Sequence, residues 1–182
     1  MGEEWEKFRK KIIHLQDDLG PFSVDFLNRD SFRRFCDNLR SRVEAYRNIW
    51  ITGYFSETIR GELQNIIKGK YNVRLICPEF AIQSERDRRN LQALKKLADA
   101  GAEIKFNNRL HARFLVAHSF TRGLLIIGSF DFNTECIGKE RYDAGIRTGH
   151  PDLVKSATEL FEQIWNEPES IPVEEFIEKT IR

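Results

Sequence analysis

Two runs of strand-forming residues carry polar side chains at alternate positions, and they constrain the fold more than any other part of the chain. The runs cover residues 110–117 and 124–133. Side chains two positions apart share one face of an extended segment, so His111 and Arg113 project to the same side. Beyond Gly128, the same alternation places three polar groups on one face: Ser129, Asp131 and Asn133. Two such strands lying side by side would gather an imidazole, a guanidinium, a hydroxyl and a carboxylate, a combination suited to phosphate chemistry.

The rest of the chain alternates between helical and strand patterns. Helical spacing of apolar residues predicts helices at 3–19, 56–67 and 85–100, a helix that follows the turn at 150–152, and a short helix within 169–182. A further helix is predicted to begin at a cap, Asp30 or Ser31, and to reach Tyr46. Short apolar runs predict strands at 23–27, 49–55, 72–77, 102–106, 112–117, 124–128 and 142–147. Helices interleaved with short, doubly buried strands indicate an α/β/α sandwich around a mixed sheet, with extra helices at the N-terminus.

The length and composition are those of a globular protein. The 182 residues suit one domain that can bury a real core. No segment approaches the roughly 18 consecutive apolar residues of a membrane span, and the charged N-terminus does not resemble a secretory signal. Three widely spaced cysteines, at positions 36, 77 and 136, favour reduced thiols. We therefore expect a cytoplasmic protein without a membrane partner.

The net charge is only +1, but its distribution is uneven. Residues 104–150 hold seven Lys and Arg against four Asp and Glu, a local charge of +3. Residues 151–182 hold three against eight, a local charge of −5. The basic share thus surrounds the candidate site, which is a mild indication of a ligand that carries phosphate.

The two strand runs also match a known motif. His111-x-Arg113 followed by Gly128-Ser129-x-Asp131 resembles the phospholipase D superfamily pattern, which is His-x-Lys, then an Asp, then Gly-Ser-x-Asn. Residues 140–146 resemble the acidic strand that follows in the family. The chain departs from the pattern where arginine replaces lysine and aspartate replaces asparagine.

The resemblance implies a role for each candidate residue. His111 would attack phosphorus and form a phosphohistidine, Arg113 would stabilise charge on the phosphoryl oxygens, and Asp143 would orient the histidine. The resemblance also implies phosphate contacts from Ser129, Asp131 and Asn133, and it requires neither a metal nor another cofactor. Because the chain holds one copy of the motif, the second histidine must come from a partner, and we expect a symmetric homodimer.

The resemblance covers about residues 48–165, and the expected organisation follows from it. We expect an N-terminal helical segment at 1–47, a phospholipase D-like domain at 48–168 and a tail helix at 169–182. The expected activity is that of a nuclease-like phosphodiesterase acting on DNA or RNA. A lipid substrate is disfavoured because the sequence shows no apolar surface helix that would bind a membrane.

Several alternatives remain open at this level. One is a rival class, a module that binds nucleic acid or phosphate and whose catalysis the two substitutions have impaired. A metal site built from His111, Asp131, Cys136 and Asp143 matches no short metal motif. Arg113 and Asp143 are also compatible with ordinary surface positions. His118 lies an odd seven residues from His111, so a regular strand would place it on the opposite face, with a structural role.

Overall fold

A computed structural model describes residues 24–55, 57–69, 71–129 and 143–181. Its strands are β1 (Val24–Asn28), β2 (Asn48–Thr52), β3 (Asn72–Pro78), β4 (Glu103–Asn107), β5 (Phe114–His118), β6 (Gly123–Gly128), β7 (Ala144–Thr148) and β8 (Ser170–Pro172). Its helices are α2 (Arg29–Cys36), α3 (Leu39–Val43), α4 (Glu57–Lys68), α5 (Glu85–Asp99), α6 (Pro151–Trp165) and α7 (Val173–Ile181). The predicted helix at 3–19 lies outside the described residues.

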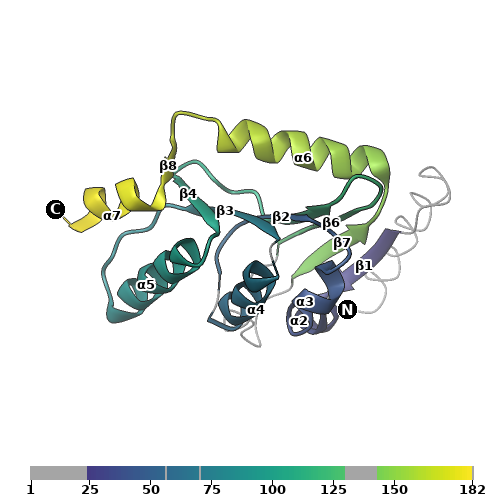
Figure 1. Ribbon diagram of the computed structural model, residues 1–182, viewed down its shortest axis with the longest axis horizontal. Helices are drawn as coiled ribbons and strands as arrows, with labels where there is room; N and C mark the ends of the chain where they lie inside the picture. The colour runs from purple at the N-terminus through teal and green to yellow at the C-terminus, as the bar shows by residue number, and fades with distance from the viewer. Residues whose placement is uncertain (1–23, 56, 70, 130–142, 182) are drawn as a thin grey trace.

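The strands form one mixed sheet with the order β1-β7-β6-β5-β2-β3-β4-β8. Strands β2, β3 and β4 run parallel, and α4 and α5 make the crossovers that parallel neighbours require. All other neighbouring strands are antiparallel. Helices α2 to α5 lie on one side of the sheet and α6 lies on the other (Figure 1). The predicted α/β/α sandwich with a mixed sheet is therefore confirmed.

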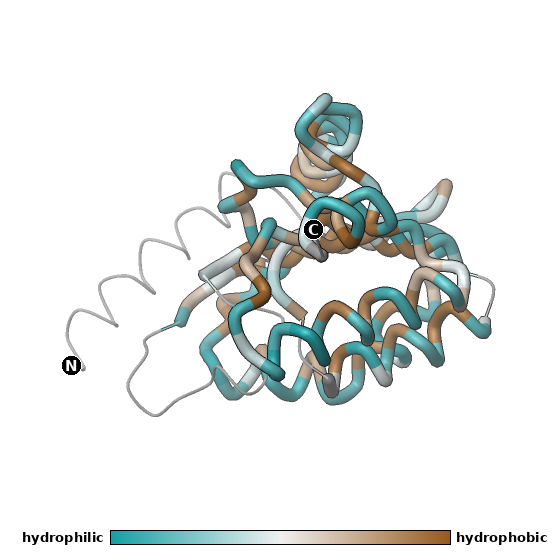
Figure 2. Tube along the Cα trace, turned by 90° about the vertical axis from the view of Figure 1, so that its left-hand side faces the viewer, coloured by the Kyte–Doolittle hydropathy of each residue, from teal (hydrophilic) through white to brown (hydrophobic). Residues whose placement is uncertain are grey.

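Two apolar clusters, one on each face of the sheet, make up the core. The larger cluster joins the sheet to α2–α5 and α7, and the smaller joins it to α6. The helices are amphipathic, with their apolar stretches turned toward the middle of the molecule (Figure 2). Under α6, Trp50 stacks on Phe161 with ring centroids 5.0 Å apart, and Phe161 stacks on Trp165 at 5.7 Å. This aromatic stack fixes α6 across the centre of the sheet.

The predicted helix that reaches Tyr46 is two short helices in the structure. Its cap is Asn28, whose Oδ1 accepts a hydrogen bond from the backbone N–H of Ser31 at 2.9 Å, rather than Asp30 or Ser31. The first helix ends at Cys36, and Asn38 leaves the helical conformation with φ −126° and ψ 27°. The predicted apolar stripe is still buried, because the break between the helices keeps Phe32, Phe35, Leu39 and Val43 on the core side.

The segments flanking the predicted domain both contribute strands. In the N-terminal segment, β1 pairs with β7, and in the C-terminal segment β8 pairs with β4. The tail, predicted as a single helix, therefore begins with a short strand before α7. Ser170 explains this start, because its hydroxyl accepts a hydrogen bond from Asn107 Nδ2 at 2.8 Å and its backbone lies beside β4.

Candidate active site at one edge of the sheet

The candidate residues that the structure describes, His111, Arg113, Ser129 and Asp143, lie at one edge of the sheet, beside the start of β5, the end of β6 and the start of β7. One row of directly paired residues crosses strands β2, β5, β6, β7 and β1 near this edge: Thr52, Phe114, Ile127, Ile146 and Phe26. One step beyond this row, the backbone N–H of Gly128 donates to the carbonyl of Arg113 at 3.3 Å. The sheet thus aligns the start of β5, the end of β6 and the start of β7.

A buried hydroxyl shapes the segment that leads into β5. Thr52 is fully buried, and its Oγ1 donates to the carbonyl of Ala112 at 2.9 Å and accepts from the N–H of Phe114 at 3.0 Å. These two bonds replace strand-to-strand pairing, so β5 begins at Phe114 and not at the predicted Ala112. Arg113 lies between the two bonded residues, which holds its backbone against the end of β2.

The turn before His111 is also anchored. Asn107, at the end of β4, is 1% exposed, and its Oδ1 accepts from the N–H of Arg109 at 2.8 Å. Its carbonyl accepts from the N–H of Leu110 at 3.3 Å, and Leu110 packs in the apolar cluster under α6. His111 follows directly and is exposed, so its position is set by a turn that is held at two points.

Ser129 and Asp143 meet across the gap between β6 and β7. The Ser129 hydroxyl donates to Asp143 Oδ1 at 3.0 Å and accepts from the N–H of Ala144 at 3.2 Å. The Ser129 N–H donates to the carbonyl of Ala144 at 3.0 Å. This pair ties together two candidate residues that lie 14 positions apart in the sequence.

The structure therefore gathers His111, Arg113, Ser129 and Asp143 at one end of three adjacent strands. Asp131, Asn133 and Cys136 lie outside the described residues. Within the described parts of the chain, no group of three or more His, Cys, Asp and Glu side chains could hold a metal ion. Cys36 and Cys77 are both free and buried, and burial raises the pKa of the Cys36 thiol to about 12.

His118 has an environment that the sequence pattern did not indicate. It ends β5 at the opposite edge of the sheet, half-buried, with its ring 4.7 Å from the Trp50 ring in an edge-on contact. Burial lowers the pKa of His118, and the nearby Glu162 opposes this shift. The expected opposite face does not apply, because His111 precedes β5 and His118 ends it, and no sequence signal marked the hollow that His118 lines.

The chain matches a family model over most of its length. The model is described as "Cardiolipin synthase, PLD-like domain", and it matches residues 42–165, a range that contains every candidate site residue. No curated protein matches the chain significantly. Among the described residues, no helix is long and apolar enough to cross a membrane.

Solved structures share the fold at low sequence identity. Nuc from Salmonella typhimurium, a phospholipase D family member, has a TM-score of 0.65 at 16% identity, covering 83% of this chain and 97% of that chain. NucT from Helicobacter pylori has a TM-score of 0.63 at 11% identity, over 83% of this chain and 99% of that chain. TrmBL2, an archaeal chromatin protein whose structure shows a novel mode of DNA binding, has a TM-score of 0.52 at 10% identity, over 90% and 61%.

The family match extends over the same strands that bring the His-x-Arg and Gly-Ser segments together, which agrees with the resemblance in the sequence. The chain belongs to the phospholipase D superfamily, a superfamily of phosphodiesterases and nuclease-like proteins, through a PLD-like domain at residues 42–165.

Proposed function

We propose that this protein is a metal-independent phosphodiesterase that cleaves nucleic acid, with His111 as its nucleophile. The observation that carries the proposal is the convergence of His111, Arg113, Ser129 and Asp143 at one edge of the sheet, inside the region that matches the family model. His111 is exposed and so is accessible to a large substrate, while half-buried Arg113 supplies a cation two residues away.

The proposed reaction has two steps. The imidazole nitrogen of His111 attacks phosphorus, the bond to the leaving oxygen breaks, and that oxygen takes a proton from His111 of a second copy. The second imidazole then takes a proton from water, which attacks the phosphohistidine and releases the phosphate product. The proposal therefore requires a homodimer with both His111 side chains near the two-fold axis.

The remaining candidate residues act on the phosphoryl group or on the histidine. Arg113 stabilises negative charge on the phosphoryl oxygens, and a guanidinium can do so with two hydrogen bonds. Asp143 is proposed to orient His111. Ser129, Asp131 and Asn133 are proposed to contact the phosphate.

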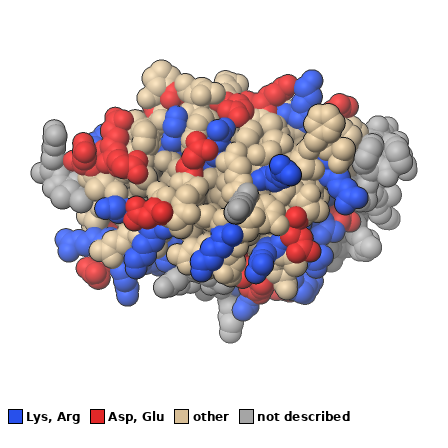
Figure 3. All heavy atoms as spheres, viewed as in Figure 1, with Lys and Arg blue, Asp and Glu red and all other residues tan. Residues whose placement is uncertain are grey.

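A second candidate function is a binding module that has lost most of its catalysis. The observation that favours it is the bond from the Ser129 hydroxyl to Asp143, which occupies the proton that Ser129 would offer a phosphoryl oxygen. The charge of the molecule also fits a modest rather than a general affinity for polyanions. Figure 3 shows Lys and Arg interspersed with Asp and Glu on the face that it displays.

The substitution His111→Asn separates the two functions. In excess EDTA, the wild-type chain is incubated with single-stranded DNA, double-stranded DNA, RNA and bis(p-nitrophenyl) phosphate. We expect cleavage by the wild type, a loss of at least about a thousandfold in the variant because the nucleophile is gone, and unchanged affinity and thermal unfolding. Wild-type turnover in the variant would remove His111 as the nucleophile. Salt-dependent binding without turnover by the wild type would favour the binding module.

A further inference from the structure

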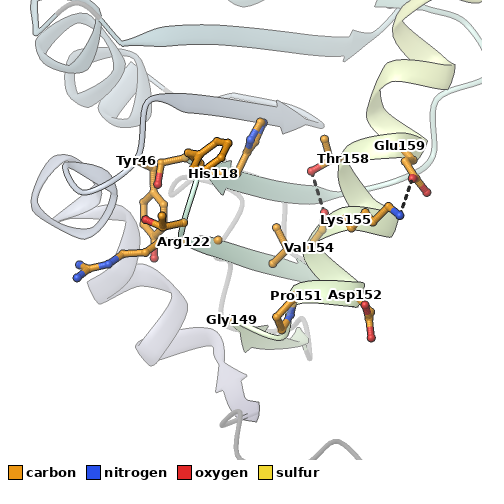
Figure 4. A pocket seen from close by; sticks show the side chains of 14 residues that line it. Tyr46, His118, Arg122, Gly149, Pro151, Asp152, Val154, Lys155, Thr158 and Glu159 are labelled. Atoms are coloured by element: carbon orange, nitrogen blue, oxygen red, sulfur yellow. Dashed lines mark hydrogen bonds and ion pairs between the residues drawn. The ribbon is translucent and has the colours of Figure 1, made fainter.

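A hollow of about 850 Å³ lies at the end of the sheet opposite to His111. Its walls are the turn between β5 and β6, the first turns of α6, and Tyr46 (Figure 4). Small-ligand sites commonly enclose about 300–1,000 Å³. His118 lines the hollow and stands seven residues along the chain from His111, which corresponds to roughly 20 Å in extended backbone. The hollow is therefore separate from the candidate active site.

Aromatic rings border the hollow on the side of the β5–β6 turn. Tyr46 and His118 are half-buried, and Phe120 at the tip of the turn is 105% exposed. The turn is closed by a bond from the Ser119 N–H to the Arg122 carbonyl at 2.8 Å, so Phe120 is held out on a short, hydrogen-bonded loop. Exposed aromatic rings beside a cavity offer flat surfaces on which a planar ring can stack.

The same wall offers hydrogen-bonding groups. The Nε2 atom of His118 is buried and has no hydrogen-bond partner among the described residues. The hydroxyl groups of Ser119 and Thr121 also line the hollow. The two hydroxyl groups can each donate and accept, so a ligand with donors or acceptors along one edge would be favoured here.

The charges at the hollow are arranged in two zones. On α6, Lys155 pairs with Glu159 at 3.8 Å, and Asp152 adds a further acid, so this wall carries no excess of cations. On the other side, Arg122 is exposed in the β5–β6 turn, whereas the N–H of Arg47 donates to the carbonyl of His118 at 3.2 Å, so the backbone of Arg47 lies across β5 from Arg122. Neither guanidinium has an ion pair within the parts of the chain that the structure describes, and Figure 4 shows Arg122 directed away from α6.

We propose that this hollow binds one nucleotide unit of a single-stranded nucleic acid. The uncharged base lies in the hollow against Phe120 and Tyr46, and the adjoining phosphate lies at Arg122. The inference rests on the proposed nucleic-acid substrate, to which it adds a second contact remote from His111, but it does not depend on cleavage by His111.

The test measures binding by the full chain with His111→Asn, so that no substrate is consumed. A fluorescein-labelled single-stranded oligonucleotide is titrated at low salt and followed by anisotropy. Phe120→Ala and Arg122→Ala are the test variants, and both side chains are exposed, so neither change should disturb folding. Leu160→Ala and Arg89→Ala are matched controls, because Leu160 is 42% exposed and Arg89 is exposed, and neither lines the hollow.

We expect Phe120→Ala to weaken binding by roughly 5- to 150-fold, since stacking on one ring contributes about 1–3 kcal/mol. Arg122→Ala should weaken binding and lower the dependence on salt by about one phosphate contact. Competition with a free mononucleotide identifies the source of the ligand. If Phe120→Ala makes the free mononucleotide a weaker competitor of the oligonucleotide, the site recognises a single nucleotide. If Phe120→Ala weakens only the binding of the oligonucleotide, the site requires a strand. Either result supports the proposal.

Equal affinity of the test variants and the controls for both probes would overturn the inference and leave the proposed catalysis untouched. Weakened binding in Phe120→Ala, together with a wild type that cleaves nothing, would keep this site and remove the proposed catalysis. A wild type that binds no nucleic acid at all would overturn both.

Discussion

At the scale of single residues, we propose that charge at position 131 sets how strongly the candidate site attracts a phosphate. The family pattern has an amide there, whereas the carboxylate of Asp131 would repel phosphate and would pair with Arg113 if it lies in the proposed site. Two charges about 4 Å apart at an effective dielectric near 20 interact by about 4 kcal/mol before desolvation. A part of that energy is enough to change affinity measurably.

Asp131→Asn should therefore bind single-stranded DNA about tenfold more tightly than the wild type at low salt. A gain of about a third of that interaction energy is roughly 1.4 kcal/mol, which corresponds to a tenfold change in affinity. Binding is titrated in a low-salt buffer, since screening hides part of the effect. Asp99→Asn is the control, because Asp99 is exposed at the end of α5 and the charge change is the same. Weaker binding by Asp131→Asn would mean that this carboxylate takes part in recognition.

His118 makes stability depend on pH. Burial lowers its pKa in the folded chain below the ordinary value of 6.5, so the unfolded chain binds the proton more readily. The stability that depends on neutral His118 is complete above about pH 6.5 and is lost as the pH falls through the folded-state pKa. His118→Gln should therefore lose less stability between about pH 7.5 and pH 5 than the wild type does.

Urea unfolding at both pH values measures this difference. An equal or larger loss in His118→Gln would mean that other groups dominate the pH dependence. His118 is only half-buried, so we expect a modest effect.

At the scale of elements, the turn between β4 and β5 is the part of the fold on which the candidate site depends most. Asn107 holds the turn through the bonds to Arg109 and Leu110, and its Nδ2 donates to Ser170 Oγ at 2.8 Å and to Glu167 Oε2 at 3.3 Å. One buried amide thus joins the residues before His111 to the end of α6 and the start of β8. Any loss of this amide removes one buried and two partly buried hydrogen bonds.

Asn107→Ala should lower the free energy of unfolding by about 2 kcal/mol, since it removes three hydrogen bonds and each contributes about 0.5–1.5 kcal/mol. Cleavage should fall further than the folded fraction does, because the turn before His111 loses an anchor. Asn38→Ala is the control, since Asn38 is exposed and its Nδ2 makes one bond, to the Arg34 carbonyl at 2.9 Å. Denaturation and single-turnover cleavage check both effects, and unchanged stability would show that the amide contacts contribute little.

At the scale of the whole molecule, the single copy of the histidine motif predicts a two-fold homodimer. Sedimentation equilibrium should then give a molar mass about twice that of the 21.4 kDa chain, because a two-fold dimer is the commonest closed assembly. Coexpression of equal amounts of wild-type and His111→Asn chains should leave about a quarter of the wild-type activity, because random pairing makes one dimer in four fully wild type. Half of the wild-type activity would mean that each chain works alone, and a monomer that cleaves DNA would refute the shared site.

The pattern of residues determined the class of this fold and the positions of most of its elements. Strands at 72–77 and 124–128 were predicted almost at their observed bounds, because an apolar run ended by Pro78 or started by Gly123 has little freedom in where it can begin or end. The predicted helix at 85–100 matches α5, since Ser84 and Asp87 form a capping box and Gly101, with φ +112°, ends the helix. These are local signals, so they can be read without the fold.

Only the tertiary structure decided what comes together. The delayed start of β5 depends on the hydroxyl of Thr52, which lies 62 residues earlier in the chain than Phe114. The pairing of Ser129 with Asp143 depends on the register of β6 and β7, and the hollow beside His118 depends on where α6 crosses the sheet. Such contacts join residues that are distant in sequence, and their partners become neighbours only when the sheet has formed. The sequence by itself therefore determined the elements and the residue types of the site, whereas long-range packing decided its geometry.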